Sequence, residues 1–548
     1  MDPLSIVALT IKVLDQLWKI GDRTATLISN FRDFDSDTRV LENKICDENN
    51  RTRALHMLLF DPSTIYGGKS LFEQFDTDVQ DQIHIFLEQA SDVLDQAYQL
   101  LNRRQDVYPK GREPKRAATP TLLVSISPSP SSASLTPNDA TVRRLKSFQR
   151  LRWSLLDKRR VETIVRDFSE LNSRIHESIK LWCLGTSIGV NLQHLKRLET
   201  DVNSQALGFD VDARLQIATS QSLAIVQSLE INDAELRQKI GDVKQVVDKF
   251  GVLHWESKPV LVEYRSYSPE SPVPVELDDR TRDLVDKLAN LLRQPKEVVF
   301  RTPCCRGWVR QMQQNRVAYI FAIPEAVDPW PISLLNILSS NDLPPPSLSQ
   351  RFWLAVKLSR CISQLQLVKW VHESFRSENI LFFPKAETRE PPTPPDNRLD
   401  LSEPWVLGFE FSRPEMYFSH GHADTCLTRD IYRHPDRQRN PTQIFSKVHD
   451  IYALGVVLLE IAGLWQPALS LEKSGFTKVQ YPHAIKKHLV RHAEKRLGAK
   501  MGDKYQNVVL KCLRGNFEVT DDTKEDLKLQ QAFRAQIVDV LQKAADSV

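Results

Sequence analysis

Several features that would assign this chain to a class at once are missing from it. Seven cysteines are scattered over 548 residues without a C-x-x-C pair, which predicts reduced thiols and argues against a disulfide framework or a zinc site. No apolar run approaches the roughly 20 residues that span a bilayer. The first 20 residues lack a basic n-region and a small-residue cleavage site, so we expect no signal peptide. These absences predict a cytoplasmic protein that is soluble when made.

Net charge and composition do not indicate a particular class of protein or partner. A net charge of +3 is too small to indicate a partner by itself. The contents of 41% hydrophobic and 26% charged residues are ordinary for globular protein. Because 548 residues exceed a single hydrophobic core, we expect two or three domains.

One motif keeps its spacing and loses its charged residues. The segment His372-Glu-Ser-Phe-Arg-Ser-Glu-Asn379 has the frame of H-R-D-L-x-x-x-N, in which the Asp is a catalytic base and the Asn holds a metal ion. Ser374 stands at the Asp position, and serine is no carboxylate base near neutral pH. Further along, Gly408-Phe409-Glu410 stands where D-F-G belongs, so Gly408 offers no side-chain oxygen to a hard cation. The pattern predicts a retained shape without phosphate transfer.

Other segments fit the same frame. Val262-Glu-Tyr-Arg265 resembles the V-A-I-K strand, with Arg265 in place of the lysine that contacts the α- and β-phosphates. Arginine presents a planar fork, so the exchange is not neutral, and we expect Arg265 to pair with Asp283 or Asp286 of the next helix. No Gly-rich loop precedes Val262. Helical spacing predicts helices over 279–292 and 349–367, and a short apolar run ended by Pro324 predicts a buried strand over 317–323. The segment 450–460 resembles a central helix of the same frame.

Four such matches, at 262–265, 372–383, 408–413 and 450–460, occur in one order at suitable spacing. Residues 256–548 therefore resemble the protein-kinase fold, an α+β bilobal domain. The resemblance implies that Asp450 hydrogen-bonds the backbone of the His372 loop. It implies no catalytic residues, because the corresponding positions are degenerate: Arg265, His372, Ser374, Asn379, Gly408, Phe409 and Glu410. We expect His372 to be a packed core residue.

We accordingly predict a pseudokinase that is not an enzyme, with no metal site and no assured cofactor. Residual ATP binding stays open. The first alternative is an atypical active protein kinase that binds ATP and uses Glu410 or another carboxylate.

The first part of the chain predicts an all-α structure. Apolar residues at spacings of three and four over 79–101 and 161–179 indicate amphipathic helices, and Gly67-Gly68 marks a break. We predict a bundle of four to six helices over residues 1–185. Its segment 117–140 is rich in Ser and Pro and is expected to be a disordered loop. Residues 186–255 continue a helical pattern and predict a brace between bundle and kinase-like domain.

Two features of this bundle predict membrane binding. An apolar helix over residues 4–20 and a basic cluster after the Ser/Pro loop supply the candidate side chains, since several basic residues near an anionic surface each contribute about 1 kcal/mol. The candidates are Leu4, Ile6, Val7, Leu9, Ile11, Leu14, Leu17, Trp18, Arg143, Arg144, Lys146, Arg150, Arg152, Lys158, Arg159 and Arg160. The alternative is a solvated helix face beside a core helix. No nucleic-acid recognition motif is present, so no nucleic acid is expected as a partner.

The bundle also resembles a family. The opening Met1-Asp-Pro-Leu-Ser-Ile-Val, the helix over 39–59, and Leu151-Arg-Trp153 continuing to Leu171 are similar to fungal HeLo domains of the prion-inhibition and propagation group. Their members associate with and permeabilise membranes in incompatibility-type cell death, which implies an inserting role for residues 4–20. Bundle, brace and kinase-like domain together resemble the architecture of the mixed lineage kinase domain-like necroptosis effector of animals.

These resemblances imply a non-catalytic cell-death effector in which the pseudokinase controls the bundle and is recruited to a membrane on activation. The implied partners are further copies of the chain as a homo-oligomer, anionic lipids, and an upstream kinase or NLR-type receptor. Ser419, Thr425, Thr428 and Tyr432 are candidate regulatory phosphosites, whose phosphate would pair with Arg413, Arg429 or Arg433. The second alternative is an adaptor or scaffold without membrane activity.

Overall fold

The computed structural model describes most of the chain and divides it into two compact units. One unit comprises Met1–Cys183 with Thr200–Phe209, and the other comprises Leu184–Glu199 with Asp210–Val548. The described residues are 3–29, 36–102, 158–220, 227–242, 245–247, 249–267, 273–340, 345–386, 399–409, 426–438, 443–464, 466–471 and 482–548. The predicted loop 117–140 lies outside these residues.

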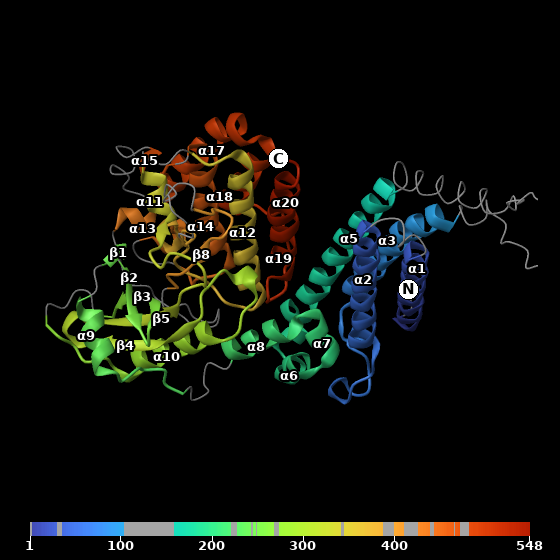
Figure 1. Ribbon diagram of the computed structural model, residues 1–548, viewed down its shortest axis with the longest axis horizontal. Helices are drawn as coiled ribbons and strands as arrows, with labels where there is room; N and C mark the ends of the chain where they lie inside the picture. Colours follow the sequence, from blue (N-terminus) through green and yellow to red (C-terminus); the bar gives the residue numbers. More distant parts are fainter. Residues whose placement is uncertain are drawn as a thin grey trace, which may run out of the picture. The chain divides into compact units, whose positions relative to one another are not determined.

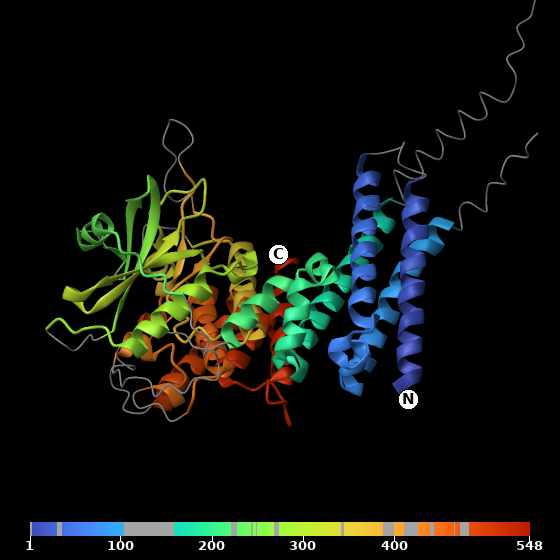
Figure 2. The same ribbon diagram turned by 90° about the horizontal axis from the view of Figure 1, so that it is seen from below.

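The first unit is a helical bundle (Figure 1). Its helices are α1 (Pro3–Ser29), α2 (Ser36–Phe60), α3 (Thr77–Asn102), most of α5 (Lys158–Gly185) and α7 (Val202–Leu207). Helix α1 packs against both α2 and α3, and Figure 2 shows α1 and α2 side by side. The helices predicted over 79–101 and 161–179 are confirmed as α3 and α5.

Apolar residues at helical spacing form the core of this bundle. On α1 the buried residues include Leu14, Leu17 and Ile28, and on α3 they include Ile83 and Leu94. This spacing places them on one stripe of each helix, as the sequence predicted. Between α2 and α3 the chain turns at Gly67 and Gly68, whose φ angles of +66° and +84° favour residues without a Cβ.

The second unit is α+β and contains a five-stranded antiparallel sheet in the order β1-β2-β3-β5-β4. Its strands are β1 (Gln245–Val247), β2 (Phe250–Trp255), β3 (Lys258–Ser266), β4 (Cys305–Gln311) and β5 (Arg316–Ala322). Helix α10 (Asp279–Arg293) follows β3 in the chain. The predicted strands over 262–265 and 317–323 and the predicted helix over 279–292 are therefore confirmed.

The two faces of this sheet bury different sets of residues, because neighbouring side chains of a strand point to opposite sides. Val262 and Tyr264 of β3 pack in a cluster with residues of α9 (Ala234–Asp242). Leu261 packs on the opposite face, in the cluster that includes Val285 of α10. Glu263 and Arg265 share the face of Leu261.

The prediction of a helical brace over 186–255 is wrong at its C-terminal end. Helices α6 (Leu192–Thr200), α8 (Phe209–Ser220) and α9 occupy much of this range, but β1 and β2 lie within it and belong to the sheet. Strand β2 pairs with β3 from Phe250 to Trp255. Valines at 243 and 247 fit a helix by spacing alone, whereas pairing with β3 provides strand partners that local periodicity does not reveal.

The remainder of the second unit is mainly helical. Its longer helices are α12 (Leu348–Leu367), α14 (Lys447–Leu459), α17 (Pro482–Met501) and α18 (Asp503–Arg514). A three-stranded sheet has the order β6-β7-β8, formed by Ile332–Ser333, Ile380–Phe382 and Trp405–Val406. The helices predicted over 349–367 and 450–460 are confirmed as α12 and α14. Across the described residues, no helix has the length and apolarity needed to cross a membrane.

Candidate functional site

Two short segments meet at the small sheet and bring the degenerate motif residues together. The loop of residues 370–379 leads from α12 into β7, and Gly408 follows β8. Strand β7 pairs with β8, and the backbone N–H of Leu407 donates to the carbonyl of Asn379 at 2.9 Å. Asn379 and Gly408, distant in sequence, therefore become neighbours.

His372 is a fully buried residue of the core, as predicted. The Asp450 carboxylate on α14 accepts the backbone N–H groups of His372 (2.7 Å) and Glu373 (3.1 Å), which confirms the expected role of Asp450. The ring Nδ1 accepts the backbone N–H of Ser374, so the proton of the neutral ring is on Nε2, 3.0 Å from the Leu407 carbonyl oxygen. Burial lowers the pKa of His372 to about 3, and the ring is therefore neutral near pH 7.

Gly408 has no room for a side chain. Its φ of +79° disfavours L residues, and a Cβ placed on it would lie 2.3 Å from Cγ and Nδ2 of Asn379. The Asn379 amide thus occupies the space that an Asp side chain at position 408 would need. Glycine at position 408 and the position of the Asn379 amide are therefore two aspects of one packing arrangement.

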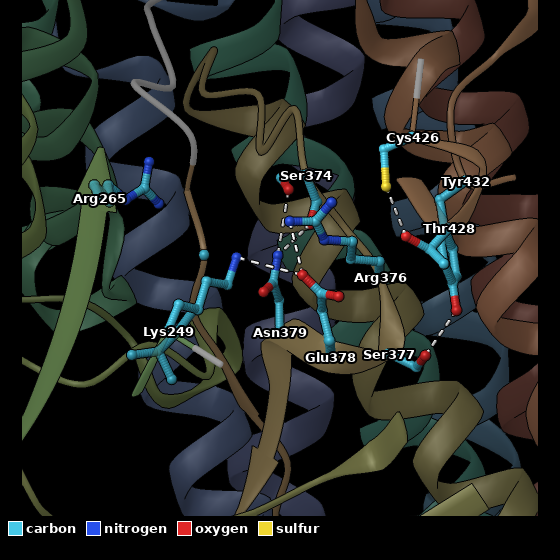
Figure 3. Close-up of polar contacts among 12 residues, drawn as sticks. Lys249, Arg265, Ser374, Arg376, Ser377, Glu378, Asn379, Cys426, Thr428 and Tyr432 are labelled. Carbon is cyan, nitrogen blue, oxygen red and sulfur yellow. Dashed lines mark hydrogen bonds and ion pairs between the residues drawn. The ribbon is translucent and has the colours of Figure 1, made fainter. Parts of the chain in front are cut away.

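Ser374 serves as the partner of Asn379. The Nδ2 amide of Asn379 donates to the backbone carbonyl of Ser374 at 2.7 Å and reaches its hydroxyl at 3.3 Å (Figure 3). The Oδ1 of Asn379 has no hydrogen-bond partner among the described residues. One amide oxygen supplies one of the six ligands of an octahedral magnesium ion.

Arg265 pairs with Glu263 on its own strand. The Nε and one terminal nitrogen of Arg265 donate to Oε1 of Glu263 at 2.9 and 2.8 Å, and both side chains are buried. The predicted partners have other contacts: Asp283 pairs with Lys287, and Asp286 accepts from Trp308. The prediction of a pair with the following helix is therefore wrong.

Residues two apart on a strand share a face, and this explains the pairing of Glu263 with Arg265. The other Glu263 oxygen accepts the backbone N–H of Gly408 at 3.3 Å. The buried carboxylate thus joins β3 to the segment after β8. The sequence predictions did not include Glu263. Its place inside an apolar strand, at the Ala position of V-A-I-K, is nevertheless a signal, because a charged residue there needs a specific partner.

A second network connects the same loop to Glu460, the residue that follows α14. The Ser377 hydroxyl lies 2.8 Å from the Tyr432 hydroxyl, which donates to Oε1 of Glu460 at 2.7 Å. The backbone N–H of Ala468 donates to the same carboxylate oxygen at 2.7 Å. Burial raises the pKa of Glu460 to about 7 and that of Tyr432 well above its usual value.

Glu378 of the loop pairs with two basic residues. One of its carboxylate oxygens lies 2.8 Å from a terminal nitrogen of the buried Arg376 and 3.7 Å from Nζ of Lys249 (Figure 3). Lys249 immediately precedes β2, so this carboxylate forms a further contact between the large sheet and the loop.

The candidate phosphosites differ in their surroundings. Thr428 is exposed on α13 (Leu427–Asp430), and its hydroxyl lies 2.9 Å from Cys426 Sγ (Figure 3). The Tyr432 hydroxyl is enclosed by Ser377 and Glu460, so phosphorylation requires that both bonds break first. Ser419, Thr425, Glu410 and Arg413 lie outside the described residues.

The membrane-binding candidates that the structure describes differ in burial. Ile6, Leu14 and Leu17 are buried and Val7 and Ile11 are half-buried. Leu9 and Trp18 are 39% and 41% exposed, and the basic residues Arg159 and Arg160 are exposed at the start of α5. Nothing is described for Arg143, Arg144, Lys146, Arg150 and Arg152, nor for the side chains of Leu4 and Lys158.

The sequence was compared with protein families and with curated proteins. Residues 331–548 match a domain of unknown function, DUF7580. This match covers less than half of the chain; it includes the His372 loop, Gly408 and α14, and it begins after β5. No curated protein matches the chain.

The Gly408–Asn379 contact predicts a difference between two glycine substitutions. Gly408→Ala should lower the free energy of unfolding by at least about 2 kcal/mol, because the cost of a strained φ and the cost of overpacking against Asn379 add together. Gly515 is the matched control: its φ of +72° and ψ of +18° are left-handed helical, and nothing lies within 4 Å of the position that a Cβ would take, so Gly515→Ala should cost about 1 kcal/mol. Denaturant unfolding measures both. Equal losses would contradict the packing argument.

Glu460 predicts a pH-dependent stability difference. Its folded pKa of about 7 exceeds its usual 4.5, so the folded state holds a proton that the unfolded state releases between these values, and stability falls as pH rises through that window. Glu460→Gln should therefore gain stability relative to the parent by roughly 2–3 kcal/mol between pH 5 and 8.

Thermal or denaturant unfolding of both proteins across this range measures the difference between their stabilities. His372 contributes the opposite pH dependence to both proteins, so its contribution cancels in that difference. Tyr432→Phe removes a donor that lowers the pKa of Glu460 and should move the window to higher pH. A difference between parent and Glu460→Gln that stays constant with pH is the contrary result.

Proposed function

We propose that the second unit has a protein-kinase-like fold. Three features support this proposal: the strand order of the large sheet, the helix α10 after its third strand, and the carboxylate of Asp450 beneath the His372 loop. Kinases hold the phosphate-contacting lysine on the third strand, before the helix that carries its acidic partner. Arg265 occupies that strand here.

This domain is, in our proposal, a pseudokinase. The single observation that carries the proposal is the Gly408–Asn379 packing, because phosphoryl transfer needs a metal-binding carboxylate where Asn379 leaves no space. The Arg265–Glu263 pair adds support. Active kinases pair the third-strand lysine with the following helix, whereas Arg265 is bound to its own strand.

The pseudokinase, we further propose, controls the helical bundle as a membrane-associating effector of HeLo type. Supporting features are the all-α bundle itself, the exposed Leu9 and Trp18 of α1, and the exposed Arg159 and Arg160. Apolar side chains and basic residues together suit binding in the interface of an anionic bilayer. Release of the bundle would then allow copies of the chain to assemble on the membrane.

Phosphotransfer assays test the loss of catalysis. The purified full chain, given ATP with magnesium or manganese, should transfer no phosphate to itself or to a generic protein substrate above the rate of a no-protein control. Turnover that disappears in Arg265→Ala would establish an atypical kinase and end the pseudokinase proposal. Arg280→Ala, which alters an exposed arginine of α10, controls for general effects of losing a charge.

Vesicle sedimentation tests the membrane proposal. The full chain should sediment with phosphatidylserine vesicles and less with phosphatidylcholine vesicles. Leu9→Gln with Trp18→Gln should reduce binding several-fold, since it removes exposed apolar surface and leaves the buried stripe of α1 in place.

The matched control is Val40→Gln with Ile85→Gln, which changes apolar residues of the same bundle that are 65% and 49% exposed. Binding that responds equally to both pairs would contradict the assignment of Leu9 and Trp18 as membrane-contacting residues. A parent chain that fails to sediment would favour an adaptor without membrane activity.

A further inference from the structure

A small basic cavity lies beside the His372 loop, on the side of α14. Its volume is about 30 Å³. The lining contains four arginines, Arg376, Arg429, Arg433 and Arg437, together with His434 and His449. The acids of the lining are Glu373 and Asp450, and Asp450 already accepts two backbone N–H groups. Positive charge therefore predominates at this cavity.

His449 presents an unpartnered donor there. Its side chain is 2% exposed, and its Nε2 has no hydrogen-bond partner among the described residues. Its Nδ1 accepts the backbone N–H of Ser446 at 2.8 Å. The neutral ring must therefore carry its proton on Nε2, which leaves a buried N–H without an acceptor. A buried donor of this kind is costly unless a ligand or water accepts its proton.

The same histidine argues against a metal ion. His434, Asp436 and His449 place possible ligand atoms within 4.8 Å of one another, a spacing that suits a cation. A metal would need a lone pair on Nε2 of His449, and that requires a proton on Nδ1, directly opposite the Ser446 N–H. The surroundings also disfavour a cation. Burial lowers the pKa of His449, with smaller contributions from His434 and then Arg437, and burial lowers the pKa of His434, with a smaller contribution from Lys486.

We propose that this cavity binds an oxyanion of phosphate chemistry. The Nε2–H of His449 donates to one oxygen, and the arginines at the rim supply charge and further donors, as guanidinium groups do at phosphate sites. Arg433 already pairs with Asp430 and Arg376 with Glu378, so the anion shares these donors with existing carboxylates. A cavity of 30 Å³ holds about two water molecules, which suits two phosphoryl oxygens with the remainder of the group at the mouth.

The proposal goes beyond the effector function and does not depend on it, since every residue that lines the cavity lies within 373–453 of the second unit. The phosphoryl group has two sources that share one chemistry, free inorganic phosphate and a phosphorylated side chain. Both are offered in the test, as inorganic phosphate and as a short neutral peptide with one phosphoserine.

Isothermal titration of the full chain at constant ionic strength tests the site. The parent should bind inorganic phosphate or the phosphopeptide saturably, and chloride or the unphosphorylated peptide should not replace them. His449→Asn keeps an acceptor for the Ser446 N–H and removes the Nε2 donor, so affinity should fall at least ten-fold. Arg437→Gln should weaken binding by a similar factor, and Arg280→Gln on α10 should leave it unchanged.

Preference for the phosphopeptide over inorganic phosphate identifies a phosphorylated side chain as the source, and equal affinity identifies the free ion. Either preference supports the site when the His449 and Arg437 variants weaken binding. The proposal is overturned if titration with phosphate or the phosphopeptide releases no more heat than titration with chloride, or if all variants bind equally well. One-to-one binding of Zn²⁺ that His449→Asn abolishes also overturns it. If His449→Asn fails to fold, Arg437→Gln still decides the outcome.

Discussion

The contact between the Asn379 amide and the backbone of Gly408 is the constraint on which the rest of the site depends. It fixes position 408 as glycine, both through a φ of +79° and through the space that the amide fills. The amide is held in turn by the carbonyl and hydroxyl of Ser374. Ser374, Asn379 and Gly408 therefore form one packed unit, and a side chain introduced at position 408 would collide with the Asn379 amide.

Glu263 extends this arrangement to the large sheet. A buried carboxylate is costly unless it is paired and hydrogen-bonded, and Glu263 satisfies both conditions through Arg265 and the Gly408 N–H. Arginine at position 265 is intelligible as the counter-ion of this carboxylate, since its fork places two donors on one oxygen. The charge retained on the third strand thus serves a connection within the protein, which accords with the proposed loss of nucleotide chemistry.

Local patterns predicted much of this fold, and contacts between distant segments account for what they missed. Periodicity identified α3, α5, α10 and α12, since each carries a repeated apolar stripe. The resemblance to a kinase-like frame indicated α14, nearly all of whose residues are buried. The resemblance to a kinase-like frame implied the hydrogen bond between Asp450 and the backbone of the His372 loop, which the structure contains. The strand pairing of Phe250–Trp255 was missed because it depends on β3 as a partner.

The arrangement of the candidate site was harder to predict from the sequence than the helices and strands around it. The closeness of Asn379 and Gly408 follows from the pairing of β7 with β8, which no local pattern specifies. The partner of Arg265 could be predicted in principle, because alternate side chains of a strand share a face. The V-A-I-K motif instead favoured an acidic partner on the next helix. Which apolar residues of α1 stay exposed depends on how α2 and α3 cover it, so Leu9 and Trp18 emerged only from the packing.

The most direct test of the central claim is a crystal structure of the full chain grown with ATP and manganese, with the ion located by anomalous scattering. The account predicts no manganese within coordination distance of Asn379 and an Asn379 amide still packed on Gly408. A manganese ion coordinated by Asn379 Oδ1 and a carboxylate beside the nucleotide phosphates would contradict it.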